Sequence, residues 1–366
     1  MDADKNILIF AANYLEIPYV LFFVDKADFK NKVSICVTKN DLYQFYKTIN
    51  NSFWQNKVDL IHYEILCADQ QLVRNKILNY LSYLYLTKRL LGKIFREHFN
   101  DIKGYKIYFF CRGAVPSFMY LLNKLKYKNE LIFMEHLNDK GESVIPYYKN
   151  SFSIKKIVLY LLDKIVYGLN VQLSTNGVWV FSFLSDSFLK KFVFQELGAE
   201  NYQQEIVACK QKYIEQFVDI VSSEMVFFEQ DLSYYLELTK QDEFYNNITK
   251  SFQNVFGDNF AIKLHPGQKK TLLPNTRNKQ ILPTYLPGEY LINPNIRYLI
   301  SFFSAVIMQK DSTQMAEGVT RIMLLDLIPF ENADVKQKIK QNITKMIEGR
   351  ILFPKSWEEL EKELEK

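Results

Sequence analysis

The sequence predicts an α/β protein with two domains, and three observations support this. The chain has 366 residues, which is too long for one ordinary domain and fits two of roughly 150 residues each. Its hydrophobic content of 48%, with only 12 Gly and 10 Pro, supports large cores and excludes a low-complexity chain. Apolar strand-like segments alternate with amphipathic segments, which is the pattern of a mostly parallel sheet covered by helices.

The first 150 residues are predicted to form the first domain. We expect strands at 6–10, 20–23, 32–37, 58–66, 105–111 and 130–136. We expect helices at 41–49, 70–99 and 116–125, where apolar residues recur at helical spacing.

Residues 151–200 are predicted to be the crossover region, with an apolar, basic helix at 154–167. The second domain, 201–330, is predicted to contain strands at 225–229, 260–264, 298–301 and 322–325, and helices at 232–256 and 312–318. Residues 331–366 are predicted to add charged C-terminal helices at 332–348 and 357–366.

Net charge limits the classes of partner. A charge of +5 is too weak for a dedicated nucleic-acid binder, so no nucleic-acid partner is expected. It would suit weak attraction to an anionic membrane surface or to acidic sugars, or it reflects a Lys-rich composition alone.

The cysteines and the amino terminus indicate a cytoplasmic protein. The four cysteines, Cys36, Cys67, Cys111 and Cys209, are far apart and lie mostly in apolar runs. That pattern favours buried free thiols in a reducing compartment rather than a disulfide framework or a metal site. The start of the chain is acidic, and Asp25 and Lys26 interrupt the following apolar run, so it makes a poor signal peptide.

The main candidate site begins at Ile262-Lys263-Leu264-His265-Pro266. The proline ends a short buried strand and holds the imidazole at its carboxyl end, where open α/β sheets bind ligands. A histidine there can offset the charge that develops on a departing phosphate. The alternative is a histidine satisfied within its loop. Lys263 either adds positive potential or is an outward-facing strand residue.

Two later segments would return to the same edge. Glu289, in Leu286-Pro287-Gly288-Glu289-Tyr290, follows His265 by 24 residues, and Ser301 and Ser304 follow it by 36 and 39. The carboxylate suits ribose hydroxyls and the serines suit phosphate oxygens. Without a ligand, these segments would be a surface turn and an ordinary strand-to-helix junction. Together with His265 they indicate a nucleotide-sugar site.

Other motifs are missing from the sequence. It has no Gly-x-Gly-x-x-Gly or Walker-type loop, which argues against dehydrogenases and P-loop enzymes, and no Asp-x-Asp pair for a metal. Two α/β domains with a phosphate-type site in the second predict a GT-B-like fold. In that fold two Rossmann-type domains face a central cleft, with the nucleotide on the second domain and the acceptor on the first.

Across residues 105–325 the motifs resemble those of bacterial sialyltransferases of glycosyltransferase family 52, which includes lipooligosaccharide sialyltransferases. Lys263-Leu264-His265-Pro266 matches the His-Pro motif and Leu286-Pro287-Gly288-Glu289 the Pro-x-Glu segment. Phe303-Ser304-Ala305 matches the serine pair, with Phe303 in place of the first serine.

The resemblance implies a homodimeric, inverting enzyme that needs no metal or other cofactor. Such an enzyme transfers sialic acid from CMP-sialic acid to a terminal sugar of a lipooligosaccharide or capsule glycan. By this resemblance the catalytic residues are Asp139 and His265. Donor binding falls to Lys263, Pro266, Glu289, Ser301, Phe303 and Ser304.

The acidic motif departs most from the family pattern. In Asn138-Asp139-Lys140-Gly141, Lys140 interrupts the expected acidic pair. Asp139 would accept the proton of the attacking hydroxyl, or else it belongs to a turn. Asp242 and Glu243 are the alternative carboxylates. Asp139 would lie at the carboxyl edge of the first domain, where Arg112, after the strand at 105–111, and His136 are minor candidates.

Two other functions stay open because of Lys140 and Phe303. One is a related glycosyltransferase that uses another nucleotide sugar, and the other is an inactive glycan-binding subunit. The expected partners are a nucleotide sugar and a glycan acceptor. The basic helix at 154–167 and the lysines of the tail (Lys336, Lys338, Lys340 and Lys345) would suit a peripheral contact with the inner membrane face. The alternative places that helix in the core or in a subunit interface.

Overall fold

The computed structural model describes residues 5–27, 29–64, 76–110, 116–133, 172–173, 179–180, 203–232, 240–265, 268–276, 279–293, 295–308, 318–347 and 349–366. The chain divides into two compact units. Unit 1 is Met1–Lys140 with Tyr148–Lys210, and unit 2 is Gly141–Tyr147 with Gln211–Lys366. The division at Lys210 falls inside helix α7 (Gln203–Ile214).

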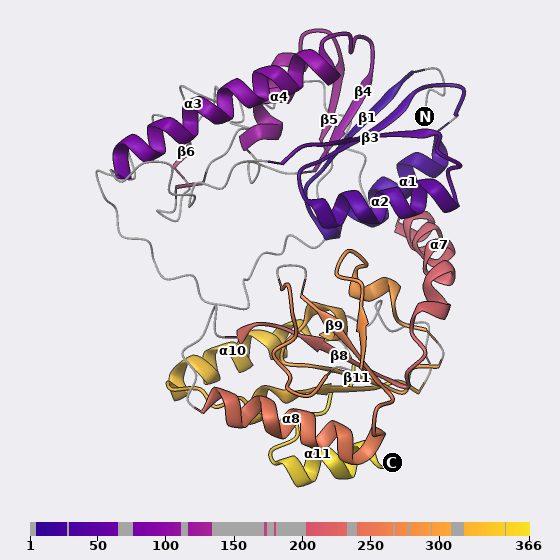
Figure 1. Cartoon of the computed structure of the whole chain (residues 1–366). Coiled ribbons are helices and arrows are strands. Elements are labelled where there is room, and N and C mark those ends of the chain that lie inside the picture. Colours follow the sequence, from indigo (N-terminus) through magenta and orange to yellow (C-terminus); the bar gives the residue numbers. More distant parts are fainter. Residues whose placement is uncertain are drawn as a thin grey trace. The chain divides into compact units, whose positions relative to one another are not determined.

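Unit 1 contains a five-stranded sheet in the order β3-β2-β1-β4-β5, with every neighbouring pair parallel. Its strands are β1 (Ile7–Ala11), β2 (Val33–Val37), β3 (Val58–His62), β4 (Lys106–Phe109) and β5 (Glu130–Phe133). Helices α1 (Ile17–Lys26) and α2 (Asn40–Ser52) cover one face, and α3 (Lys76–Ile94) and α4 (Pro116–Leu125) cover the other (Figure 1). A π-helical turn, Phe95–Phe99, follows α3.

The predicted strand at 20–23 was wrong, because these residues lie in α1. Pro18 stands in the first turn of α1, where a backbone N–H has no helical partner to lose. The run is apolar on almost every side, so periodicity alone does not separate a buried helix from a buried strand. Its buried side chains are Ile17, Val20, Leu21, Phe22, Phe23 and Val24.

Unit 2 contains a second five-stranded sheet in the order β10-β9-β8-β11-β12, again with every neighbouring pair parallel. Its strands are β8 (Met225–Glu229), β9 (Phe260–Leu264), β10 (Gln280–Leu282), β11 (Tyr298–Ser301) and β12 (Thr320–Met323). Strand β10 was not predicted, because three residues carry too little pattern. The predicted helix at 232–256 is observed as α8 (Gln241–Phe256).

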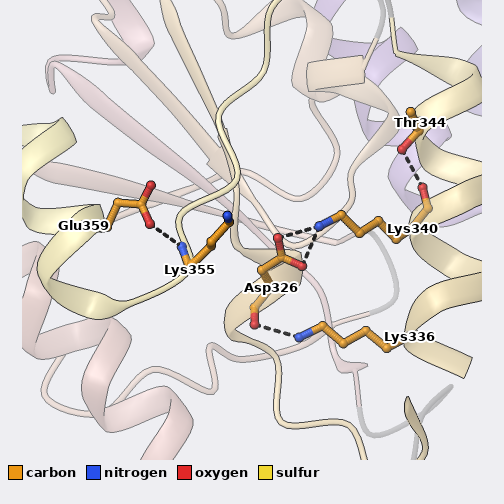
Figure 2. Close-up of polar contacts among 6 residues, drawn as sticks. All are labelled: Asp326, Lys336, Lys340, Thr344, Lys355 and Glu359. Carbon is orange, nitrogen blue, oxygen red and sulfur yellow. Dashed lines mark hydrogen bonds and ion pairs between the residues drawn. The ribbon is translucent and has the colours of Figure 1, made fainter. Parts of the chain in front are cut away.

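Both C-terminal helices belong to unit 2. Helix α11 (Trp357–Leu364) packs against α8, and the rings of Trp357 and Phe244 lie 5.9 Å apart (Figure 1). Helix α10 (Ala333–Met346) is tied to Asp326, which follows β12. Lys340 Nζ donates to both carboxylate oxygens of Asp326 at 2.9 and 2.6 Å, and Lys336 Nζ donates to its backbone oxygen at 2.7 Å (Figure 2). These two ammonium groups therefore anchor the tail.

The strand order of each unit, with the first strand central, is that of a Rossmann-type fold. The predicted α/β class, with two Rossmann-type domains as in GT-B folds, is confirmed by these two sheets. Cys36 and Cys209 are buried free thiols, as predicted, whereas Cys67 and Cys111 lie outside the described residues. None of the helices that the structure describes is long and apolar enough to cross a bilayer.

Candidate functional site at the carboxyl edge of the second sheet

Strands β9, β8 and β11 are neighbours and run parallel, so their carboxyl ends lie side by side. From β8 the chain continues to β9 on one side, while β11 lies on the other. The strand order therefore reverses between β8 and β11, and such a switch point is where open α/β sheets bind ligands. His265 follows β9, Glu229 ends β8 and Ser301 ends β11. The topology thus gathers residues that are far apart in the sequence.

Glu229 is the residue of this edge that sequence reasoning missed. Its side chain is buried, and its carboxylate accepts hydrogen bonds from Gln268 Nε2 at 3.1 Å, Thr271 Oγ1 at 2.5 Å and Leu272 N at 2.6 Å. Burial raises the pKa of Glu229, and the three hydrogen bonds offset part of that rise. The available signal was a single carboxylate ending the apolar run Met225–Phe228.

His265 directly follows β9, and its side chain is exposed. Its backbone N–H is shared between Glu229 O and Gln268 Oε1, each at 3.1 Å. Gln268 N donates back to His265 O at 2.8 Å and closes a turn. The backbone of His265 is therefore fixed while its imidazole reaches solvent. Pro266 lies outside the described residues.

One of the two predictions for Lys263, that it faces outward from its strand, is wrong. It is buried, because β9 is an interior strand of the sheet. Its Nζ donates to Leu264 O at 2.9 Å and to Thr284 O at 3.2 Å. The ammonium group therefore holds the segment after β10 against the end of β9, and that segment leads to Gly288.

Gly288 lies at a close approach between segments of this edge. A Cβ atom added there would lie 2.7 Å from a ring carbon of Phe228 and 2.8 Å from Val306 Cγ2. Only glycine allows this packing of the turn Gly288–Tyr290 against β8 and the start of α9 (Ala305–Met308). The next residue, Glu289, is partly buried. Its carboxylate makes no hydrogen bond or ion pair with the residues that the structure describes.

In the serine segment, the hydroxyl groups of Ser301 and Ser304 have different roles. Ser301 is fully buried, and its Oγ accepts a hydrogen bond from Ser304 N at 3.0 Å, so it shapes the loop and does not reach a ligand. Ser304 is partly exposed, and its Oγ accepts from Val306 N at 3.3 Å, which leaves its own proton to donate. Phe303 is buried, and its N–H donates to Gln230 Oε1 at 3.4 Å.

The structure places only some of the predicted carboxylate bases and their neighbours. Asp139, Arg112 and His136 lie outside the described residues. Asp242 and Glu243 are exposed in the first turn of α8. Within the described ranges, no group of three or more His, Cys, Asp or Glu side chains is arranged to hold a metal ion.

The side chains that this edge can offer to a ligand are therefore those of His265, Glu289 and Ser304. An imidazole and a hydroxyl can donate hydrogen bonds to phosphate oxygens, and a carboxylate can accept them from sugar hydroxyls. Behind them, Glu229, Lys263 and Ser301 are buried and bonded to the loops that carry the three.

Among known proteins, this chain is similar only to solved structures, and only in fold. No family model matches the chain, and no curated protein matches it. A UDP-N-acetylglucosamine 2-epimerase from Rickettsia bellii is 10% identical, with a TM-score of 0.39, over 94% of this chain and 88% of that one. A UDP-glucosyltransferase from Polygonum tinctorium is 10% identical, with a TM-score of 0.35, over 100% of both chains. The scores are low, and the assignment of the fold rests on the two strand orders.

Proposed function

We propose that this chain is a glycosyltransferase that takes its sugar from a nucleotide donor, and that the donor is CMP-sialic acid. The observation that carries the proposal is the convergence at one switch point of the carboxyl ends of β9, β8 and β11, with the turn containing Gly288 packed against Phe228. The choice of donor comes from the resemblance of the His265, Glu289 and Ser304 segments to sialyltransferase motifs.

His265 has the central role in the proposed reaction. A hydroxyl oxygen of the acceptor attacks the anomeric carbon of the donor, and the bond from that carbon to the phosphate oxygen breaks. The bonding electrons go to the phosphate, where negative charge develops. A protonated His265 imidazole donates a hydrogen bond to that oxygen and stabilises the charge without a metal.

Other residues supply binding and the base. Ser304 Oγ–H donates to a phosphate oxygen, and the Glu289 carboxylate accepts from the ribose hydroxyls. Asp139, as the general base, takes the proton of the attacking hydroxyl. A single displacement inverts the configuration of the anomeric carbon. The acceptor under this proposal is a terminal sugar of a bacterial surface glycan, met in the cytoplasm or at the inner membrane face.

One observation favours a second donor class. Phe303 stands where the family has the first serine of its pair, and its ring is buried. The edge therefore has one hydroxyl fewer for the phosphate than the family pattern has. A related transferase that uses another nucleotide sugar would fit this difference.

A donor panel tests both candidates. The purified chain is incubated with CMP-sialic acid, UDP-hexoses and GDP-sugars, and release of each nucleotide is followed with and without glycan acceptors. Acceptor-dependent release of CMP is the expected result. Turnover of a UDP-hexose without turnover of CMP-sialic acid would overturn the choice of donor. Saturable binding of CMP without any turnover would indicate an inactive glycan-binding subunit.

A further inference from the structure

The loop after β9 is hydrogen-bonded to one buried side chain. The carboxylate of Glu229 accepts hydrogen bonds from Gln268, Thr271 and Leu272, which are 39, 42 and 43 residues further along the chain. Thr271 Oγ1 in turn accepts from Leu273 N at 3.1 Å. One side chain of β8 therefore holds residues 268–273 in place.

Gln268 connects this carboxylate to the backbone of His265. Its Nε2 donates to Glu229 Oε1 at 3.1 Å, and its Oε1 accepts from His265 N at 3.1 Å. Because Gln268 N also donates to His265 O at 2.8 Å, the carboxamide and the backbone of Gln268 hold His265 from two sides. The Glu229 carboxylate is therefore connected to the backbone of His265 through a single side chain.

Packing alone does not account for a carboxylate at this position. Glu229 is 1% exposed and has no cationic partner among the residues that the structure describes. Its burial raises its pKa, so its charged form is disfavoured there. An apolar side chain of similar volume would avoid this penalty. What it would lack is an acceptor for the three donors of the loop.

We propose that Glu229 is the positioning residue for His265, and that its oxygens fix the loop from which the imidazole meets the leaving phosphate. The role rests on the proposed function of His265. A group displaced by about 1 Å from its reacting position can cost on the order of 100-fold in rate.

Two substitutions separate positioning from the filling of space. Glu229→Met keeps the volume but leaves Gln268, Thr271 and Leu272 without an acceptor. Glu229→Gln keeps one oxygen for Gln268 and Leu272, while its NH₂ group donates to Thr271 Oγ1. We expect kcat to fall about 30- to 100-fold in Glu229→Met with KM for the donor nearly unchanged. In Glu229→Gln we expect kcat within about threefold of wild type.

Asn293→Ala is the matched control for lost stability. Asn293 is buried in the same unit before β11, at the opposite edge of the sheet, and its Nδ2 donates to Val221 O at 3.3 Å. This variant should lower the melting temperature and leave kcat at the wild-type value. An equal loss of kcat in Asn293→Ala, or a full loss in Glu229→Gln, would overturn the positioning role.

A second measurement does not depend on enzymatic activity. The chain has four histidines, so the NMR signal of the His265 side chain can be assigned from its disappearance in His265→Ala. Glu229→Met should shift or broaden that signal, whereas Glu229→Gln and Asn293→Ala should leave it in place. An unchanged signal in Glu229→Met would refute the inference. If wild-type protein turns over no nucleotide sugar, the proposed function fails, and the NMR result still decides whether Glu229 positions His265.

Discussion

Units 1 and 2 share a strand order, but a buried glutamate near the end of the central strand has different hydrogen-bond partners in each. Each has a buried glutamate at or just after its central strand, Glu16 in unit 1 and Glu229 in unit 2. Glu16 accepts hydrogen bonds from the backbone N–H groups of Ala12 and Asn13 and from the Asn13 side chain, all within four residues. Glu229 accepts from residues that are 39 to 43 positions away.

The difference shows that a buried glutamate can bond within its own turn in one unit and to a distant loop in the other. A local bond shapes only the turn in which it lies. A distant bond fixes one segment relative to another, and in unit 2 the fixed segment begins at His265. In unit 2 the buried glutamate therefore links β8 to the loop that begins at His265.

The largest effect is expected from His265→Ala. It should lower turnover by about two to three orders of magnitude, because it removes a donor that acts on the transition state. Thermal stability should not change, because the side chain is exposed. His98→Ala, an exposed histidine of unit 1, is the control and should keep full activity. Near-wild-type turnover in His265→Ala would refute the site.

Asp139→Asn tests whether unit 1 contributes the base. If the carboxylate takes the acceptor proton, turnover should fall by about two orders of magnitude or more, since asparagine cannot act as a base. An aspartate present only for a turn would tolerate asparagine, which keeps the same turn chemistry. Steady-state kinetics with the preferred donor and acceptor decide between the two roles. Wild-type kcat in Asp139→Asn would move the search to Asp242 and Glu243.

Two glycine substitutions compare how closely the backbone is packed in each unit. Gly288→Ala in unit 2 should destabilise by about 1–3 kcal/mol, because its Cβ would overlap Phe228 and Val306. Gly92→Ala in α3 of unit 1 meets only Arg96 at 3.9 Å. It should stabilise by up to about 1 kcal/mol through helix propensity. Urea unfolding measures both, and equal effects would contradict the close packing at Gly288.

The pH dependence of stability should reflect Glu229. Its folded pKa is raised above the ordinary glutamate value of 4.5 by burial. Its contribution to stability is therefore fully present at low pH and is lost as pH rises through the folded pKa. Urea unfolding of wild type and Glu229→Gln at about pH 5 and about pH 8 should show wild type losing stability relative to the variant. A constant difference would contradict the raised pKa.

The smallest effect is expected from removal of metal. Activity should survive EDTA, because the proposed reaction stabilises its leaving group through His265 and uses no metal ligand. The assay compares donor turnover before and after chelation, with added Mg²⁺ as the reference. Loss of activity that Mg²⁺ restores would contradict the metal-independent mechanism.

The sequence by itself determined most of the strands of the sheet in unit 2. The predicted strands at 225–229, 260–264 and 298–301 and the helix at 116–125 have the observed bounds. Buried parallel strands are almost uninterrupted apolar runs, and that signal is local. The same signal failed at α1, because a short helix that is apolar on most sides gives the same run.

For the candidate site, the sequence singled out His265, Glu289 and Ser304, because their residue types and neighbours suit phosphate and sugar chemistry. The tertiary structure decided the tasks of Lys263, Ser301 and Glu229, whose side chains are buried. Lys263 reaches Thr284 across 21 residues, and Glu229 reaches Leu272 across 43. Such bonds form only after parallel strands bring distant segments together, and no local pattern encodes which donor will meet which acceptor.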